Sequence, residues 1–216
     1  MRHMPIDGTL LIARHHESEW NKAGIWTGSR DVHLTPFGKH MSFEMGLQVR
    51  EFDIQQAVCS MQCRTKETLE VMLRAMGKED VPVIRSAAIN ERDYGDYTGK
   101  NKLAMKEVLG EVEFDRMHRE YWYPIPHGES LAMVYARAVP YYLETIVPLL
   151  TQGKNVLMVS HGNTIRALMK YIEGISDEDI KNVEMLFGSV LIYRVDDQGK
   201  LISRDERFTD KYESHH

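Results

Sequence analysis

The chain has 216 residues, 43% of them hydrophobic and 27% charged, a composition typical of a globular protein. We expect a single domain over residues 1–216, because the chain contains no linker, repeat or low-complexity stretch. The net charge of −5 gives no support to nucleic-acid or membrane partners, so an anionic ligand would need a local cluster of cations. The apolar runs are shorter than the roughly 18 residues of a membrane span, and we expect no signal peptide. With two cysteines, a reducing, cytoplasmic location is expected.

The predicted elements alternate between short apolar runs and helical patterns. In chain order they are a strand at 9–13, a helix at 35–52, a strand at 57–60, a helix at 66–76, a short apolar run at 83–85, helices at 103–119 and 131–150, a strand at 156–160, a helix at 163–172, and a strand at 190–195 that ends at a turn. Apolar strands separated by helices favour a three-layer α/β fold, with a mostly parallel central sheet and helices on both faces. The end residues 1–4 and 215–216 are assigned no function.

Ligands of open α/β sheets bind beyond the C-terminal ends of the strands, so the segments after the apolar runs are the candidates for a site. These segments offer imidazoles, guanidiniums and one carboxylate, namely His15, His161, Arg14, Arg64, Arg92 and Glu91. Two of the loops run directly into helices, whose N-termini favour anions.

This set of side chains suits phosphoryl transfer. Arginine forks bind phosphate oxygens, and a neutral imidazole such as His15 can attack phosphorus and form a phosphohistidine. Two arginines and a second imidazole, His161, can position the phosphoryl group and neutralise its charge without a metal. The departing alcohol needs a proton, for which Glu91 is the candidate donor.

Most of these residues also have a plain structural interpretation. A histidine at a strand end is usually a hydrogen-bonded loop residue, and we interpret His16 as structural. Arg64 could be a solvated side chain on a first helical turn, and Glu91 with Arg92 could form a surface ion pair. Ser18 could be no more than a helix N-cap.

A zinc site is not expected. Neither His15-His16 nor Cys59-x3-Cys63 has the usual ligand spacing, and an adjacent arginine would repel the cation at each place. The sequence therefore predicts a site without a metal.

Residues 14–21, Arg-His-His-Glu-Ser-Glu-Trp-Asn, resemble the R-H-G-E-S-x-W-N signature of the histidine phosphatase superfamily. The likeness extends from about residue 7 to about residue 200 and continues at 27–38, 60–65, 90–102, 128–131 and 160–168. Within the superfamily, Asn-Glu-Arg-x-Tyr-Gly followed by Asn101-Lys102 is most similar to the mutases that are primed by 2,3-bisphosphoglycerate.

The resemblance implies a role for each matching residue. His15 would carry the phosphoryl group, Arg14, Arg64 and His161 would hold it, and Glu91 would donate and accept the proton. The implied substrate-binding residues are Ser18, Asn21, Thr27, Gly28, Arg92, Tyr94, Lys102, His118, Arg119, Gly162 and Asn163. Members interconvert 3-phosphoglycerate and 2-phosphoglycerate in glycolysis and gluconeogenesis. The resemblance thus implies 2,3-bisphosphoglycerate as primer, small phosphorylated glycerates as partners, and a monomer or homodimer.

Four departures from the pattern leave two alternatives open. His16 stands for a glycine, Ser29 for an aromatic residue, His118 for an arginine, and Phe187-Gly188-Ser189-Val190 for Thr-Gly-Val-Pro. A looser site would admit water, which favours a phosphomonoesterase that uses the same histidine. A decayed site would leave a catalytically weak phospho-ligand-binding or interaction protein. His118 also suggests that substrate affinity falls as pH rises through the titration of an imidazole.

Overall fold

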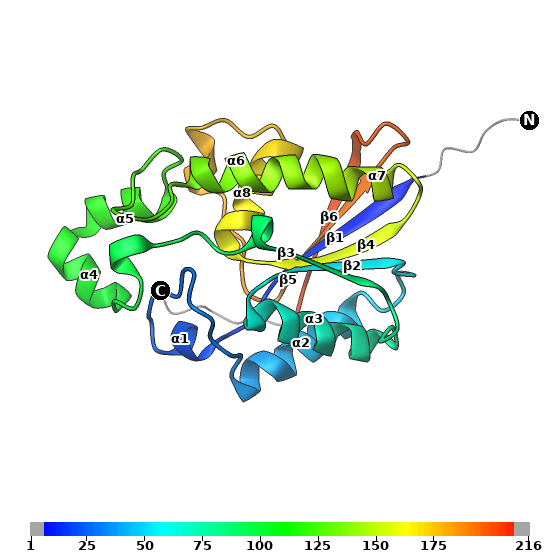
Figure 1. Ribbon diagram of the computed structural model, residues 1–216, viewed down its shortest axis with the longest axis horizontal. Coiled ribbons are helices and arrows are strands. Elements are labelled where there is room, and N and C mark those ends of the chain that lie inside the picture. The colour runs from blue at the N-terminus through cyan, green and yellow to red at the C-terminus, as the bar shows by residue number, and fades with distance from the viewer. Residues whose placement is uncertain (1–6, 210–216) are drawn as a thin grey trace, which may run out of the picture.

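The computed structural model describes residues 7–209, and the terminal residues that are assigned no function lie outside this range (Figure 1). A six-stranded sheet has the order β3-β2-β4-β1-β5-β6. The strands are β1 (Gly8–Arg14), β2 (Gln56–Ser60), β3 (Val83–Ser86), β4 (Asn155–Ser160), β5 (Ser189–Val195) and β6 (Leu201–Phe208). Strands β3, β2, β4 and β1 run parallel, whereas β5 is antiparallel to β1 and β6 to β5. The mostly parallel sheet is therefore as predicted.

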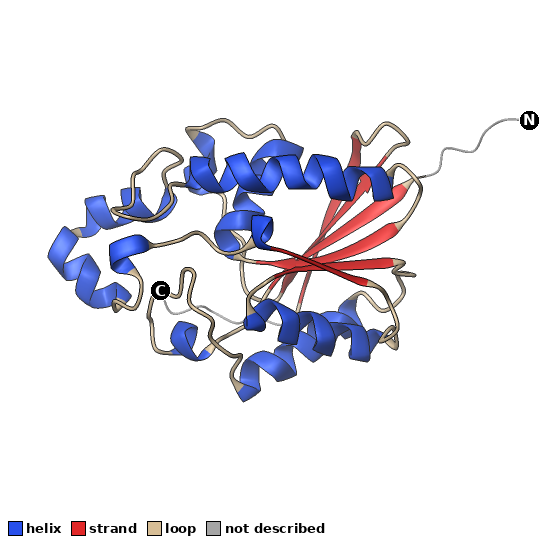
Figure 2. Cartoon of the chain, viewed as in Figure 1, coloured by secondary structure: helices blue, strands red, loops and turns tan. Residues whose placement is uncertain are grey.

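Helices cover both faces of this sheet (Figures 1 and 2). On one face lie α2 (Pro36–Gln48) and α3 (Cys63–Met76). On the other face lie α6 (Leu131–Tyr141), a π-helical turn (Tyr142–Ile146), α7 (Val147–Leu150) and α8 (Gly162–Ile172). The short α1 (Glu19–Lys22), α4 (Lys102–Leu109) and α5 (Glu111–Arg119) lie beyond the C-terminal ends of the parallel strands. Single 3₁₀ turns occupy Ala87–Ile89, Gly95–Tyr97 and Asp179–Asn182.

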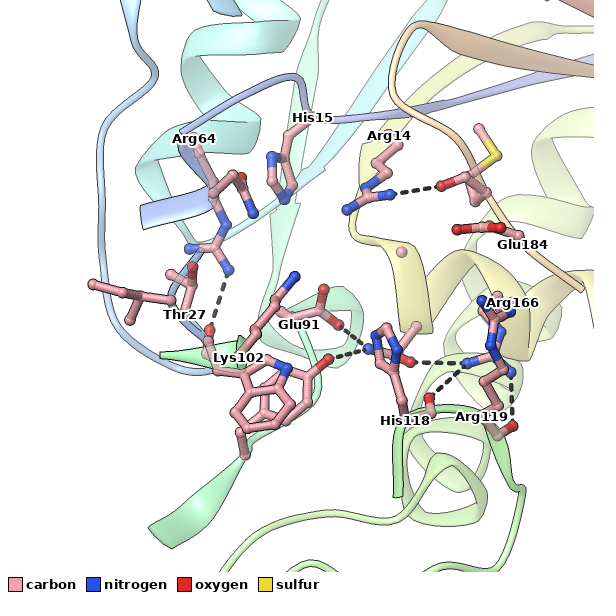
Figure 3. Close-up of a pocket in the computed structure, with 18 of the residues that line it drawn as sticks. Arg14, His15, Thr27, Arg64, Glu91, Lys102, His118, Arg119, Arg166 and Glu184 are labelled. Carbon is pink, nitrogen blue, oxygen red and sulfur yellow. Dashed lines mark hydrogen bonds between the residues drawn. The ribbon is translucent and has the colours of Figure 1, made fainter. Parts of the chain in front are cut away.

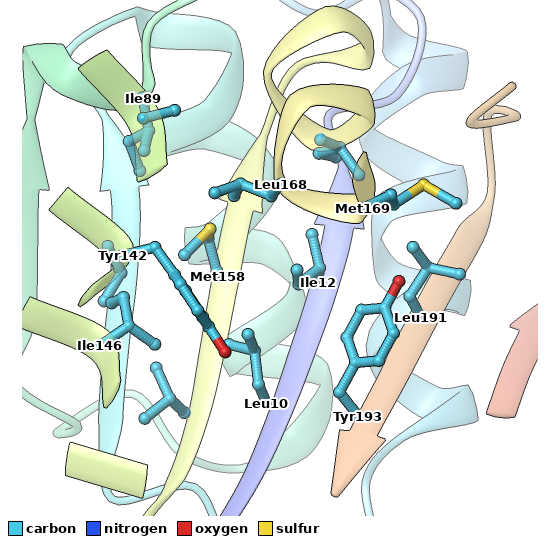
Figure 4. Packing of buried hydrophobic residues seen from close by; sticks show 14 of the residues in the cluster. Leu10, Ile12, Ile89, Tyr142, Ile146, Met158, Leu168, Met169, Leu191 and Tyr193 are labelled. Carbon is cyan, nitrogen blue, oxygen red and sulfur yellow. The ribbon is translucent and has the colours of Figure 1, made fainter. Parts of the chain in front are cut away.

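The central strands are apolar throughout because each is buried on two sides. Leu10 and Ile12 of β1 pack with Leu168 of α8 in one core cluster (Figure 4). Leu11 and Ala13 point to the opposite face and belong to a second cluster, which α2 and α3 cover. Side chains of a strand alternate between the two faces of its sheet, so two buried faces require a continuous apolar run.

The structure corrects three details of the predicted elements. The helix expected over 103–119 is broken at Gly110, whose φ of +79° is in the region that favours glycine. Strand β6 was not expected, and neither was the short α1, which Ser18 caps. No helix within residues 7–209 is both long enough and apolar enough to cross a membrane.

Candidate active site

The register of the central strands places the two histidine loops side by side. Arg14 of β1 pairs with Ser160 of β4, so His15 and His161, which follow them, leave the same edge of the sheet. Their ring centroids are 5.0 Å apart. A pocket opens here, lined by Arg14, His15, Asn21, Ile25, Trp26, Thr27, Gly28, Arg64, Glu91, Tyr94, Lys102, His118, Arg119, Gly162, Asn163, Arg166, Val183, Glu184 and Met185 (Figure 3).

His15 is buried and carries the geometry of a nucleophile. Its Nδ1 donates a hydrogen bond to the His16 carbonyl over 2.8 Å. Because a carbonyl can only accept, Nδ1 holds the proton and Nε2 holds a free lone pair. Burial and the positive charges of Arg64 and Arg14 lower the pKa of His15 well below its usual range. The imidazole is therefore neutral at pH 7, the form that can attack phosphorus.

His161 is fully buried next to His15 and is not among the residues that line the pocket. Its Nε2 is 2.8 Å from the Ser60 hydroxyl, while its buried Nδ1 has no hydrogen-bond partner among residues 7–209. Burial, then the charge of Arg64, lowers the pKa of His161 well below its usual range. A buried polar atom without a partner is costly, so Nδ1 is suited to contact a bound ligand.

Arg14 and Arg64 flank the His15 ring (Figure 3). Arg14 donates to the Met185 carbonyl over 2.7 Å and lies 3.8 Å from the centroid of the Phe187 ring. Arg64 donates to the carbonyls of Arg30 and Gly28 over 2.9 and 3.1 Å. The Nε atoms of both arginines are buried and lack a partner in the described part of the chain. Two fixed guanidiniums with unpaired N–H groups can bind the oxygens of a phosphoryl group.

The Glu91 carboxylate faces the same cavity (Figure 3). Its Oε1 accepts from the backbone N–H of Arg92 over 2.7 Å and from the Asn163 amide over 3.3 Å. The same amide nitrogen donates to the Tyr94 hydroxyl over 2.9 Å. Glu91 is thus held at the cavity in a position from which a carboxyl group can exchange a proton with a ligand.

Three further cations line the same pocket. Lys102 begins α4, Arg119 ends α5, and Arg166 reaches in from α8. Burial and the nearby charge of Arg14 lower the pKa of Lys102 to about 8. Burial, then the charge of Arg92, lowers the pKa of Arg166 to about 10. With Arg14 and Arg64, these cations give the pocket enough positive charge to bind more than one negative group of a ligand.

His118 also lines the pocket, but as an uncharged group. Burial and the charges of Lys102 and Arg92 lower its pKa well below the usual range. The imidazole therefore does not titrate between pH 6 and 8 in the free protein. The lowered pKa does not favour the expectation that His118 sets the pH dependence of substrate affinity, and Lys102, with a pKa of about 8, is the alternative group in the pocket.

Three of the predicted site residues do not line the pocket. His161 is the first, as described above. Ser18 is the N-cap of α1, where its hydroxyl donates to the Asn21 side chain over 2.7 Å. Arg92 is fully buried, with its guanidinium 4.6 Å from the Tyr94 ring centroid and a hydrogen bond to the Met117 carbonyl over 3.3 Å. Ser18 and Arg92 thus support residues of the wall and do not themselves form it.

Comparison with known proteins places the chain in a family. Residues 10–206 match the histidine phosphatase superfamily (branch 1). A protein of Cytophaga hutchinsonii named 2,3-bisphosphoglycerate-dependent phosphoglycerate mutase is 42% identical over 190 residues, 88% of this chain and 87% of that protein. A phosphoglycerate mutase structure from Bacillus anthracis has a TM-score of 0.77 at 18% identity, covering 91% of both chains. A mycobacterial glucosyl-3-phosphoglycerate phosphatase has a TM-score of 0.75 at 20% identity, covering 87% of this chain and 90% of that one. The chain belongs to the histidine phosphatase superfamily.

Two departures from the superfamily pattern contact each other. The His16 and Phe187 rings have centroids 5.4 Å apart. His16 Nδ1 accepts from the Glu17 N–H over 2.8 Å, and burial lowers its pKa to about 4, so the ring is neutral. Within residues 7–209 the only non-glycine residue with positive φ is His127, so the backbone at His16 does not require glycine.

Sequence reasoning missed part of the wall. Arg166 lies one turn after Asn163 on α8 and donates to the Asn163 side chain over 3.1 Å, so helical spacing could have identified it. It also donates to the carbonyls of Arg119 and Ile180, each over 2.8 Å, which ties α8 to the end of α5. Ile25 and Trp26 directly precede the predicted Thr27 and Gly28, so their place in the chain could have identified them, whereas no local pattern identifies Val183, Glu184 and Met185.

Proposed function

We propose that this protein interconverts 3-phosphoglycerate and 2-phosphoglycerate through a phosphohistidine at His15. The observation that carries the proposal is that one pocket gathers more cations than a single phosphate needs, since Lys102, Arg119 and Arg166 line it together with Arg14 and Arg64. A phosphatase needs to bind one phosphate, whereas a mutase must also retain a doubly phosphorylated intermediate while it changes orientation. The similarity to proteins named 2,3-bisphosphoglycerate-dependent mutases supports the same assignment.

The residues of the site divide the chemistry between them. The lone pair on His15 Nε2 forms the nitrogen–phosphorus bond as the bond from phosphorus to the ester oxygen breaks. Arg14 and Arg64 bind the oxygens of the phosphoryl group that is being transferred, and His161 contacts this group through Nδ1. Glu91 gives its proton to the departing oxygen and takes the proton of the hydroxyl that attacks next. Lys102 and Arg119 hold the carboxylate and the phosphate that remains.

The buried donors without partners fit 2,3-bisphosphoglycerate as the primer. Arg14 Nε, Arg64 Nε and the Thr27 hydroxyl lack partners among residues 7–209, and their side chains line the same pocket as His15, Lys102 and Arg119. When bound, the primer supplies the phosphoryl group that His15 carries. The site residues alone perform the transfer in this proposal, so no metal is needed. We further propose a cytoplasmic monomer or homodimer acting in glycolysis and gluconeogenesis.

A phosphorus NMR time course on 3-phosphoglycerate, with and without catalytic 2,3-bisphosphoglycerate, tests the proposal. Primer-dependent appearance of 2-phosphoglycerate is the expected result, and full activity should persist in EDTA. Growth of inorganic phosphate in its place would assign a phosphomonoesterase. Absence of both products would leave the phospho-ligand-binding alternative. Intact mass after exposure to the primer separates these outcomes further, since a gain of one phosphoryl group that His15→Ala abolishes requires a working nucleophile.

A further inference from the structure

One arginine outside the pocket holds the loop that carries Glu91. Arg137 of α6 donates from Nη1 to the carbonyls of Ala88 and Asn90, over 2.8 and 3.0 Å. Its Nη2 donates to the carbonyl of Glu91 over 3.1 Å. Three backbone carbonyls within four residues therefore converge on one guanidinium, immediately behind the carboxylate that faces the cavity.

Glu129 orients the guanidinium. Arg137 Nε donates to Glu129 Oε1 over 2.8 Å, and Nη2 donates to Oε2 over 2.9 Å. Glu129 Oε2 also accepts from the backbone N–H of Asp93 over 2.9 Å, so the same carboxylate fixes the chain on the other side of Glu91. The guanidinium forms five hydrogen bonds, as many as it has N–H groups, which leaves none for a ligand.

The Glu91 loop depends on such support because it has little regular structure. Strand β3 and the 3₁₀ turn at Ala87–Ile89 end before Glu91, and residues 90–94 belong to no helix or strand. From the opposite side, the Gln62 side chain accepts from the Glu91 N–H over 2.9 Å. The position of the carboxyl group is thus set by contacts between side chains and backbone, since no sheet or helix fixes it.

We propose that Arg137, oriented by Glu129, is a positioning residue that sets the Glu91 carboxyl group for proton transfer. The inference rests on the proposed function in that Glu91 serves as the proton donor. A proton donor matters most when the leaving group is a poor one. An alkyl phosphate such as glycerol 2-phosphate releases an alkoxide and needs the proton, whereas p-nitrophenyl phosphate releases a stable phenolate and does not. Loss of positioning should therefore slow the first substrate selectively.

The experiment compares kcat/KM for these two substrates in Arg137→Gln, Arg137→Lys and Glu129→Gln. The ratio kcat/KM reports the steps up to departure of the leaving group, so hydrolysis of the phosphohistidine does not obscure it. Misplacement by about 1 Å can cost on the order of 10²-fold, so we expect a loss of about 10- to 10²-fold for glycerol 2-phosphate. The loss for p-nitrophenyl phosphate should stay below about 3-fold, and Arg137→Lys should be milder than Arg137→Gln because charge is kept.

Arg204→Gln is the matched control. Arg137 pairs with one carboxylate, Glu129, and Arg204 pairs with two, Glu173 and Glu206. The Arg204 side chain is 37% exposed against 24% for Arg137, and Arg204 lies on β6 and does not line the pocket. It should leave both substrates unaffected. Equal losses for the two substrates in folded Arg137 variants, or no loss, would overturn the proposal. Glu129→Gln keeps the test decisive if Arg137→Gln fails to fold.

Glu91→Gln separates this proposal from the proposed function. It should lower kcat/KM for glycerol 2-phosphate by about 10²- to 10⁴-fold and largely spare p-nitrophenyl phosphate. If it shows no such selectivity, the assignment of Glu91 fails and the role of Arg137 fails with it. If it does show selectivity and the Arg137 and Glu129 variants do not, only the positioning role is refuted. Neither result depends on whether the protein acts as a mutase or a phosphatase.

Discussion

Lys102 offers a sharp test of the electrostatics of the pocket. Its ammonium group lies among other cations, and burial with the charge of Arg14 lowers its pKa from 10.5 to about 8. A charged lysine that is buried among other cations lowers the stability of the folded protein. Its charge becomes favourable only when an anion binds beside it. We predict that Lys102→Met makes the protein more stable at pH 7 while weakening substrate binding.

The size of the effect follows from the shift. One pKa unit corresponds to about 1.4 kcal/mol, and partial contact of the side chain with water reduces the full value, so we expect a gain of about 1–3 kcal/mol at pH 7. The folded pKa lies below the unfolded one. The cost is therefore complete below pH 8 and is relieved as pH rises from about 8 to 10.5, where the folded form loses its proton first.

Urea unfolding of wild type and Lys102→Met at pH 7 and pH 10 measures this directly. The variant should be more stable at pH 7, and the difference should shrink at pH 10. Lys106→Met is the control on the same helix, because the Lys106 side chain is 40% exposed and pairs with Glu111. It should give no gain in stability at pH 7. A Lys102→Met variant that is no more stable than wild type, or a gain that is the same at both pH values, would refute the reasoning.

Three further predictions concern the site. His15→Ala should give no phosphoryl mass shift after exposure to 2,3-bisphosphoglycerate and no turnover, as intact mass and a coupled assay will show; retained turnover would exclude His15 as the nucleophile. The Michaelis constant for 3-phosphoglycerate should stay flat from pH 6 to 7.5, because His118 is neutral throughout this range. It should rise about 10-fold by pH 9 as Lys102 loses its proton, since the protonated fraction changes about tenfold per pH unit above the pKa. Lys102→Arg should remove the rise, and a rise that persists in this variant would assign it to another group. His16→Gly and Phe187→Leu should be non-additive in chemical denaturation by about 0.5–1.5 kcal/mol, because their rings contact each other; strictly additive losses would show that the contact contributes nothing.

The edge of the sheet where the site lies could be predicted from the sequence because parallel strands bring their C-terminal ends together. His15 and His161 both follow buried strands that are paired in the sheet, which is enough to place them side by side. Which of the predicted residues actually line the pocket could not be read from the sequence. Arg92 turns inward and stacks on Tyr94, an outcome that depends on the packing of α5 and that its sequence neighbours do not reveal.

The elements that escaped prediction lack a strong apolar pattern. The sequence predicts the turn at 196–199 but not β6 after it, because residues 204–207 are all charged. Pairing with β5 in an antiparallel ladder holds this strand, and that pairing is a tertiary contact. At Gly110 the helical pattern continues on both sides, so only the positive φ shows that the chain turns between α4 and α5.

The contact between His16 and Phe187 changes what the departures imply for the reaction. Taken singly, loss of a glycine after the nucleophile and of a Thr-Gly-Val-Pro segment argues for a loose site that admits water. In the structure the Phe187 ring stacks on the Arg14 guanidinium at 3.8 Å and lies against both the His15 and His16 rings. Arg14 is thus fixed by an aromatic face as well as by the Met185 carbonyl. The wall beside the nucleophile is therefore packed at these two positions, and His16 and Phe187 by themselves do not predict a site that is open to water.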